Sequence, residues 1–348
     1  MQADQPAPRA AARPGASVMR DVARLAGVSH QTVSRVLNAH PNVREDTRRR
    51  VLDAMQALNY RRNSAARALV TRRSGTLGVI GYESTLFGPA SMLYAIESAA
   101  RAAGYFVTVA TVRQLDRRPV LEAVDWLRQQ AVEGIVAIAP KPAVAHALAE
   151  VAADVPLVGV GSGYDAAVPS CRIDNAAGAR LATRHLLDLG HTTVHHVAGP
   201  AGWTEAQERV DGWRETLYTA GAVVPRTGPH DWSAKDGYEA GRQLAVDPSV
   251  TAVFCANDQL ALGVLRAMHE SGRPVPEQVS VIGFDDTPDA GYFLPPLTTV
   301  RQDFAELGRR SLAVLLEQLT VGGPRIGADH GLLLPELIVR GSTAPPAR

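Results

Sequence analysis

The stretch Arg20–Leu37, RDVARLAGVSHQTVSRVL, predicts two short helices joined by a tight turn. The apolar positions at helical spacing are Val22, Leu25 and Ala26 before the turn, and Val33, Val36 and Leu37 after it. Gly27 can adopt the left-handed backbone that ends a helix, and Ser29 can cap the next helix. This order predicts a helix-turn-helix, whose second helix enters the major groove of DNA.

The polar face of the second predicted helix carries side chains that can bond to base edges or phosphates. They are His30, Gln31, Thr32, Ser34 and Arg35. An ordinary helical hairpin with a solvated polar face is the alternative interpretation. The turn residues, the groove-suited side chains and the surrounding charge agree with one another, so DNA binding is favoured.

Charge is unevenly distributed along the chain, although the net charge is only +1. Residues 1–73 contain 14 Arg and 5 Asp or Glu, a net charge of +9. The remainder contains 22 Lys or Arg and 30 Asp or Glu, a net charge of −8. This asymmetry predicts a polyanion-binding head attached to a body with another task.

The bulk properties limit the class of protein. With 348 residues, the chain can form two or three compact units. It has no apolar run of membrane-spanning length and no signal sequence at its start, so we expect a soluble, cytoplasmic protein with no membrane partner. Its two cysteines, Cys171 and Cys255, provide neither a disulfide framework nor metal-ligand spacing.

After Thr76, short apolar runs alternate with longer helical stretches. The predicted strands include Leu77–Ile80, Tyr105–Ala110, Gly134–Ala139, Leu157–Val160, Thr193–Ala198, Ala252–Cys255 and Val279–Phe284. The predicted helices include Met92–Ala103, Ala176–Leu189, Thr204–Ala220, Asp236–Leu244 and Leu260–Glu270. This alternation indicates an α/β fold with parallel sheets covered by helices, and its length suits two lobes. Ligands of such bodies bind in the cleft between the lobes, at the carboxyl ends of the strands.

The expected domains follow from these patterns. The boundaries are a disordered arm over 1–17, a helix-turn-helix domain over 18–62, a hinge over 63–74, an effector-binding and dimerisation body over 75–342, and a tail over 343–348. Within the helix-turn-helix domain, a third helix over Arg44–Asn59 is expected to cover the first two.

Several segments resemble the lactose/galactose repressor family of bacterial transcription regulators. They include RDVARLAGVSHQTVSRVLN, VREDTRRRVLDAMQALNY and NSAARAL near the start, and DLGHTTVHHVAGP, VFCANDQLALGVLRAM and VSVIGFDDTPDAGYFLPPLTTVRQDFAELG later. The resemblance extends from about Val18 to Arg340, and DWSA and ANDQLALG look most like the lactose repressor branch. It implies a helix-turn-helix headpiece and a two-lobed, periplasmic-binding-protein-like body. In that body, one lobe would combine approximately 75–173 with 303–332, and the other would combine 174–302 with 333–342.

The resemblance also implies roles in DNA binding. His30, Gln31 and Arg35 would read bases, and the residues that would contact or orient on phosphates are Ser29, Thr32, Ser34 and Asn38. The hinge contacts with DNA would involve Asn63, Ala66 and Leu69, with Leu69 as an apolar wedge in the minor groove. Two departures from the family are His30, which leaves the operator sequence open, and Arg62, where the family usually has proline.

For the effector cleft, the matching positions are Phe87, Arg209, Trp232, Asn257 and Asp285. Asp285 can accept two hydroxyl hydrogen bonds, and Trp232 offers an apolar face to a sugar ring. An Asx turn at Asp285 and a core role for Trp232 are the alternatives. The segment Gly159–Tyr164 lacks the carboxylate that the lactose repressor has in its cleft, and Ile138 replaces a polar group, so the identity of the sugar stays open.

Other signals carry no function. His195 and His196 would point to opposite faces of a strand, and with His191 they lack further ligands at metal-binding spacing, so no metal site is predicted. The glycine-rich Gly159–Gly163 lacks the rest of a nucleotide-binding motif. No catalytic constellation stands out, and the chain is predicted to be neither an enzyme nor a cofactor-binding protein.

The sequence thus predicts a sequence-specific DNA-binding regulator, a repressor of carbohydrate-utilisation genes that a galactoside- or glucoside-like sugar releases from a near-palindromic operator. The tail after Gly341 has no leucine heptads, so a homodimer is expected. One alternative is a corepressor-dependent regulator that binds a purine. A sugar-binding protein that does not bind DNA is the other, and it would need an export signal.

Overall fold

Three short helices make up the described part of the N-terminal unit: α1 (Met19–Ala26), α2 (His30–Leu37) and α3 (Glu45–Ala57). Gly27 follows α1 with left-handed backbone at φ +64°. The Ser29 hydroxyl accepts a hydrogen bond from the backbone N–H of Thr32 at 3.2 Å. Both expected features of the turn are therefore confirmed.

The core of this unit is built from small and β-branched side chains. Its buried members are Val22, Ala23, Ala26, Val33, Val36, Val51 and Ala54. Leu25 was expected in the apolar stripe of the first helix, and this prediction is wrong, because Leu25 is 56% exposed. At 100° per residue, Val22, Ala23 and Ala26 span one arc that faces the other helices, and Leu25 lies outside that arc.

The computed structural model describes residues 17–37, 40–60, 73–82, 85–113, 116–138, 141–164, 168–321 and 329–347. The chain divides into two compact units, Met1–Arg73 and Ser74–Arg348. Some predictions therefore lie outside the described residues: those for the N-terminal arm up to residue 16 and for Asn38, Arg62, Asn63, Ala66 and Leu69.

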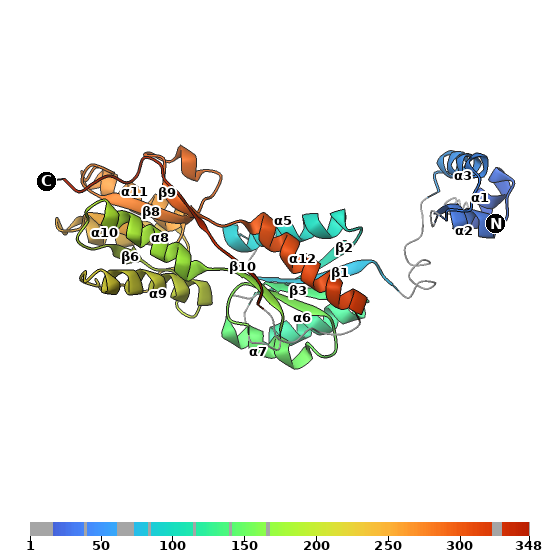
Figure 1. The fold of residues 1–348 in the computed structure, drawn as a ribbon, viewed down its shortest axis with the longest axis horizontal. Helices are drawn as coiled ribbons and strands as arrows, with labels where there is room; N and C mark the ends of the chain where they lie inside the picture. The colour runs from blue at the N-terminus through green and yellow to red at the C-terminus, as the bar shows by residue number, and fades with distance from the viewer. Residues whose placement is uncertain are drawn as a thin grey trace, which may run out of the picture. The chain divides into compact units, whose positions relative to one another are not determined.

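The second unit contains two sheets (Figure 1). Sheet A has the strand order β10-β5-β4-β3-β1-β2, and its neighbouring strands are all parallel. Its strands are β1 (Thr76–Tyr82), β2 (Phe106–Val112), β3 (Ile135–Ile138), β4 (Leu157–Val160), β5 (Ser170–Ile173) and β10 (Asp329–Leu333).

Sheet B has the order β11-β9-β8-β7-β6. Its strands are β6 (His195–Val197), β7 (Ala252–Cys255), β8 (Ser280–Asp285), β9 (Thr298–Arg301) and β11 (Glu336–Ile338). The pairs from β6 to β9 are parallel, and β11 runs antiparallel to β9. The predicted α/β class with mostly parallel sheets is confirmed, and β4 and β7 have the predicted bounds.

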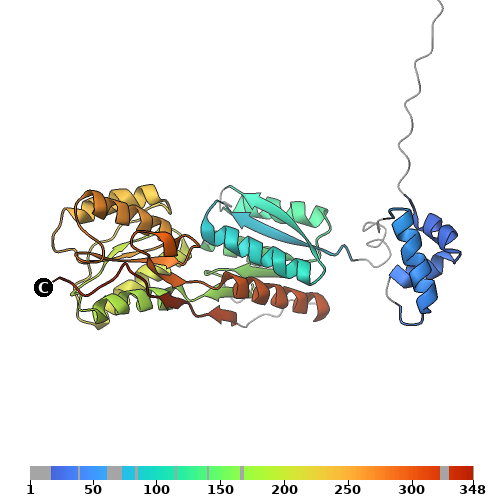
Figure 2. The same ribbon diagram turned by 90° about the horizontal axis from the view of Figure 1, so that it is seen from above.

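Helices cover both faces of each sheet, and Figure 2 shows these layers from a second direction. On sheet A, α5 (Phe87–Ala102) and α12 (Phe304–Val321) pack on one face, and α6 (Arg117–Gln129) and α7 (Pro142–Val151) pack on the other. On sheet B, α8 (Asn175–Asp188) and α9 (Thr204–Thr219) pack opposite α10 (Ala234–Ala245) and α11 (Asp258–Glu270). Short apolar strands buried on both faces are typical of parallel sheets.

The chain crosses between the sheets after β5, after β9 and after β10. Two of these crossovers are joined by the backbone N–H of Asp174, which donates to the Leu333 carbonyl at 2.9 Å. The Asp174 carboxylate also caps α8 by accepting from the Ala177 N–H at 2.7 Å. The first crossover therefore passes directly into a helix of the other lobe. No helix in the described residues is long and apolar enough to cross a membrane.

Candidate functional site

A cavity of about 440 Å³ lies where the two sheets face each other, at the carboxyl ends of their strands. All five effector residues predicted from the sequence line it: Phe87, Arg209, Trp232, Asn257 and Asp285. They come from α5, α9, the segment before α10, the N-cap of α11 and the end of β8. The fold thus brings together residues that are up to 198 positions apart in the sequence.

Two hydrogen bonds and an aromatic contact position the guanidinium of Arg209. Its Nε donates to Asn175 Oδ1 at 2.9 Å, and its Nη1 donates to the Ala256 carbonyl. Its Cζ lies 3.9 Å from the ring centroid of Phe284, a cation–π contact. Burial lowers the pKa of Arg209, but the nearby carboxylates, Asp285 foremost, oppose this effect. The guanidinium is therefore preorganised at one end of the cavity.

Asp285 is the last residue of β8 and has left-handed backbone at φ +114°. Its Oδ1 accepts a hydrogen bond from Gln302 Nε2 at 2.6 Å. Burial raises the pKa of this carboxyl to about 6, and Arg209 and the Gln302 hydrogen bond act in the opposite direction. The carboxylate can accept hydrogen bonds from ligand hydroxyls, as expected from its residue type.

Trp232 and Asn257 also line the cavity. The Asn257 carbonyl oxygen caps α11 by accepting from the Leu260 N–H at 2.8 Å, and its Nδ2 donates to the Trp232 carbonyl at 3.2 Å. The Trp232 ring packs edge-on against Trp203, with centroids 5.5 Å apart. Gly199 lies beneath this ring, where any Cβ would collide with it. Asn257 therefore positions Trp232 as well as lining the cavity.

The wall from sheet A is apolar. Phe87 lies at the start of α5 and packs edge-on against Phe304 at the start of α12, with centroids 5.9 Å apart. Ile138 and Val160 extend this wall. The cavity thus has one polar end and one apolar end, which suits a ligand that carries both polar and apolar groups.

Several lining residues were not predicted from the sequence. They are Asn175, Trp203, Glu205, Gln302 and Phe304. Asn175 and Gln302 each follow shortly after the end of a strand, so the rule that ligands bind at carboxyl ends of parallel strands could have found them. The rule could not be applied to them because the four-residue strands β5 and β9 were not among the strands predicted from the sequence.

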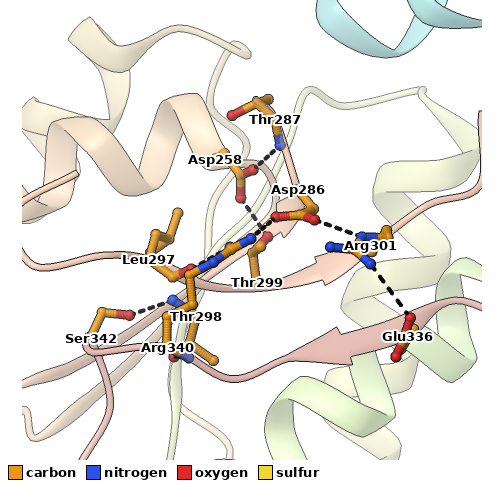
Figure 3. Close-up of polar contacts among 10 residues, drawn as sticks. All are labelled: Asp258, Asp286, Thr287, Leu297, Thr298, Thr299, Arg301, Glu336, Arg340 and Ser342. Carbon is orange, nitrogen blue, oxygen red and sulfur yellow. Dashed lines mark hydrogen bonds and ion pairs between the residues drawn. The ribbon is translucent and has the colours of Figure 1, made fainter. Parts of the chain in front are cut away.

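Polar contacts surround Asp258 and Asp286 (Figure 3). Asp286 accepts from Arg301 Nε at 2.7 Å and from Arg340 Nη2 at 2.6 Å. Asp258 accepts from the Thr287 N–H at 2.7 Å and from the Thr299 hydroxyl at 2.6 Å, and burial raises its pKa to about 7. These contacts fix the loop that follows β8 and so fix the direction of Asp285.

Of the predicted DNA-binding residues, those that the structure describes lie on α2 or just before it. Ser29, His30, Gln31 and Arg35 are exposed, whereas Thr32 and Ser34 are half-buried. The hydroxyls of Ser29 and Thr32 lie 2.9 Å apart within hydrogen-bonding distance. The opposite face of α2 is buried through Val33 and Val36. The helix thus offers an exposed polar face of the kind that reads a groove.

His191 and His196, on or near strand β6, have hydrogen-bonding partners in the protein. His191 Nδ1 lies 2.9 Å from the Thr251 hydroxyl, and His196 Nδ1 lies 2.8 Å from the Phe254 carbonyl. Burial lowers the pKa of His196 to about 3. Within the described residues, no group of three or more His, Cys, Asp or Glu side chains could hold a metal ion.

Comparison with known proteins identifies both units. Residues 18–63 match the model of bacterial regulatory proteins of the lacI family, and residues 183–343 match a periplasmic binding protein-like domain. The lactose operon repressor of Escherichia coli (strain K12) is 37% identical over 331 residues, which cover 94% of this chain and 90% of that protein. The chain belongs to the lacI family. The predicted family and fold are therefore confirmed.

Solved structures extend the comparison over both units of this lacI-family protein. A crystal structure of the lac repressor dimer bound to operator and the anti-inducer ONPF has a TM-score of 0.83 and 35% identity, covering 94% of this chain and 99% of that one. The complex of the transcriptional regulator CelR with cellobiose has a TM-score of 0.68 and 32% identity, covering 95% and 100%. This lacI-family protein is a DNA-binding transcriptional regulator with an effector-binding body.

Proposed function

We propose that this regulator represses carbohydrate-utilisation genes and is released from its operator when a galactoside- or glucoside-like sugar binds in the cavity. The observation that carries the proposal is the joint position of Arg209, Asp285 and Trp232 on one cavity of about 440 Å³. Carboxylate and guanidinium groups recognise hydroxyls, and an indole face packs against the apolar face of a sugar ring. The CelR relative, whose structure is a complex with cellobiose, supports a sugar ligand.

The DNA partner is an operator with two related half-sites. Base contacts are assigned to His30, Gln31 and Arg35, and phosphate contacts to the other polar residues around α2, Asn38 included. The hinge over 63–74 supplies Asn63, Ala66 and the Leu69 wedge by resemblance. A DNA partner also assigns the protein to the cytoplasm.

A homodimer is the proposed assembly, because two headpieces are needed for two half-sites. The lac repressor relative is a dimer on its operator. Large apolar side chains are exposed on the body of this chain: Tyr94 is 71% exposed, Tyr292 is 87% and Leu294 is 91%. Exposed apolar surface of this kind is typical of protein interfaces, and a second copy of the chain is the proposed occupant.

Induction requires that the sugar and the operator disfavour each other by the same coupling free energy, typically about 1–3 kcal/mol. The cavity is lined by Asn175 and Gln302, which lie on two crossovers between the sheets. We therefore propose that a ligand in the cavity draws the two sheets together and acts directly on these two crossovers. The proposed result is a hinge geometry that is incompatible with the operator.

The test begins with selection of bound sequences from a random DNA pool by the full-length protein. Binding to the selected duplex is then measured with galactose, glucose, cellobiose, ONPG and hypoxanthine. We expect one sugar to weaken DNA binding by about 5- to 150-fold, the range that corresponds to typical coupling. Tighter binding with hypoxanthine would instead indicate a purine corepressor, and failure to enrich any sequence would favour a sugar-binding protein that does not bind DNA. Recovery of the added sugar unchanged is expected, because no enzymatic activity is proposed.

A further inference from the structure

Glu205 has an unusual position in the cavity. It lies in the first turn of α9 and lines the cavity. One of its oxygens, Oε1, accepts a hydrogen bond from the Ser162 N–H at 3.2 Å. The other, Oε2, is buried and has no hydrogen-bond partner in the described part of the chain. A buried carboxylate oxygen without a partner costs stability, so its retention needs a reason.

The neighbouring cation does not provide that partner. Arg209 lies one helical turn after Glu205, on the same side of α9. Its donors are directed to Asn175 and to the Ala256 carbonyl, and its Nη2 lies 3.8 Å from Asp285. Among the residues that the structure describes, the ionisable side chains that line the cavity are the carboxylates of Glu205 and Asp285 and the guanidinium of Arg209.

The Trp232 indole adds a second unpartnered group. Its Nε1 is buried and also lacks a hydrogen-bond partner among the described residues. The Trp232 ring centroid lies 5.6 Å from Arg209 Cζ, so this donor belongs to the same end of the cavity as the guanidinium. A hydroxyl both donates and accepts hydrogen bonds, so a hydroxyl-rich ligand can satisfy an acceptor and a donor of this kind.

The charges of the cavity-lining side chains determine which ligands are excluded from the cavity. Among the described lining residues, a phosphate or carboxylate on the ligand would face two carboxylates and a single guanidinium, which is already paired with Asp285 at 3.8 Å. Like charges brought together in a cavity of low dielectric repel strongly. A neutral ligand avoids this cost.

We infer that Glu205 is a specificity-determining residue, whose Oε2 accepts a hydrogen bond from a hydroxyl of a neutral effector and rejects phosphorylated or carboxylate-bearing ones. This inference rests on the proposed function, since it concerns the ligand of the same cavity. Glu205 also supplies, from α9, a cleft carboxylate in a chain whose Gly159–Tyr164 segment has none. The carboxylate therefore approaches the ligand from the other lobe.

The test compares Glu205→Gln with Glu208→Gln in the full-length protein. The Glu205→Gln substitution keeps an oxygen that can accept from the Ser162 N–H, but it removes the negative charge. Glu208 is a matched control on the same helix, because its Oε2 accepts from the Ser162 hydroxyl at 2.8 Å and it does not line the cavity. The probes are galactose, glucose, cellobiose and ONPG, together with galactose 6-phosphate and glucose 6-phosphate.

Binding of each probe is measured by titration calorimetry. The neutral sugar that binds most tightly to the wild type should bind about 10- to 100-fold more weakly to Glu205→Gln, the loss expected for a hydrogen bond to a charged group. Its affinity should change by less than about threefold in Glu208→Gln, because that carboxylate does not reach the ligand. The preference for the neutral sugar over its 6-phosphate should shrink in Glu205→Gln. Unchanged affinity and unchanged preference in that variant would overturn the inference.

The melting temperature of the ligand-free variants provides an independent result at about pH 8, above the pKa of about 7 to which burial raises the Glu205 carboxyl. A carboxylate kept for a ligand destabilises the empty protein, so Glu205→Gln should melt at a higher temperature than the wild type. A lower melting temperature would show that Glu205 merely holds the Ser162 loop, and it would overturn the inference. If no sugar binds the wild type, the proposed function fails, and the melting result still decides whether Glu205 is a structural residue.

Discussion

Nη2 of Arg209 lies 3.8 Å from Oδ1 of Asp285, and the two side chains are only 7% and 10% exposed. Each group is also bound by an amide, Asn175 for the guanidinium and Gln302 for the carboxylate. The 3.8 Å separation is longer than a hydrogen bond, and the neutral amides of Asn175 and Gln302 hold the two charged groups in position. This arrangement keeps opposite charges ready for ligand hydroxyls, at a cost in desolvation that the ion pair only partly offsets.

Removal of the Arg209 side chain should destabilise the body. Arg209→Ala leaves the Asp285 charge buried and uncompensated, and we expect a loss of about 3–5 kcal/mol in the free energy of unfolding. The double variant Arg209→Ala/Asp285→Asn should lose less free energy of unfolding than the sum of the losses in Arg209→Ala and Asp285→Asn. Urea denaturation measures each value. The control is Arg180→Ala, an exposed pair with Glu215 that should cost at most about 1 kcal/mol.

The pH dependence of stability should change in Asp285→Asn. Burial raises the pKa of Asp285 from 3.8 to about 6, so the native state binds this proton more tightly than the unfolded chain. Stability contributed by the protonated form is therefore lost as pH rises from about 4 to about 6. Relative to the wild type, Asp285→Asn should become more stable across this interval, as followed by urea denaturation at each pH. A constant difference between the two proteins would contradict the assigned burial effect.

Two substitutions at Trp232 should separate stacking from hydrogen bonding. Trp232→Ala removes the ring face and should abolish the response of DNA binding to sugar. Trp232→Phe keeps a flat apolar face but lacks Nε1, so it should retain a weakened response. Sugar titrations of the protein–DNA complex measure both. Trp126→Phe is the control, because Trp126 is 44% exposed on α6 and does not line the cavity.

Arg35 should determine operator preference. Arg35→Ala should lose about 1–3 kcal/mol of discrimination between the selected DNA sequence and its variants, while the affinity for sugar stays the same. Competition binding with mismatched duplexes measures the preference. Arg101→Ala removes an exposed arginine of the body and serves as the charge-matched control. Equal preference in Arg35→Ala and in the wild type would show that α2 reads DNA through other residues.

The exposed loop after β8 should contribute to the dimer. Leu294→Asp places a charge where an apolar side chain is 91% exposed, so it should shift a dimer toward monomer without unfolding the body. Sedimentation at several concentrations measures the mass. The control is Val246→Asp, an 84% exposed position after α10 that is not assigned to the interface. If Leu294→Asp sediments like the wild type, this loop lies outside the interface.

Local sequence patterns determined the turn of the helix-turn-helix, the fold class and the position of several strands. Gly27 and Ser29 specified the turn of the helix-turn-helix, because left-handed backbone and helix capping depend on single residues. Alternating apolar runs and helical stretches predicted the α/β class, and buried strands such as β4 and β7 were located to the residue. The five cavity residues taken from the resemblance also lie together.

The tertiary structure alone decided how the cavity is completed. Gln302, Phe304 and Asn175 reach it because strand order brings distant crossovers together, and no local pattern encodes strand order. Leu25 shows the same limit, because helical spacing does not say which arc of a short helix its neighbours will cover. The unpartnered Oε2 of Glu205 likewise follows from burial, which is a property of the packed chain. Residue type and spacing set local geometry, whereas burial and convergence depend on contacts between residues far apart in the sequence.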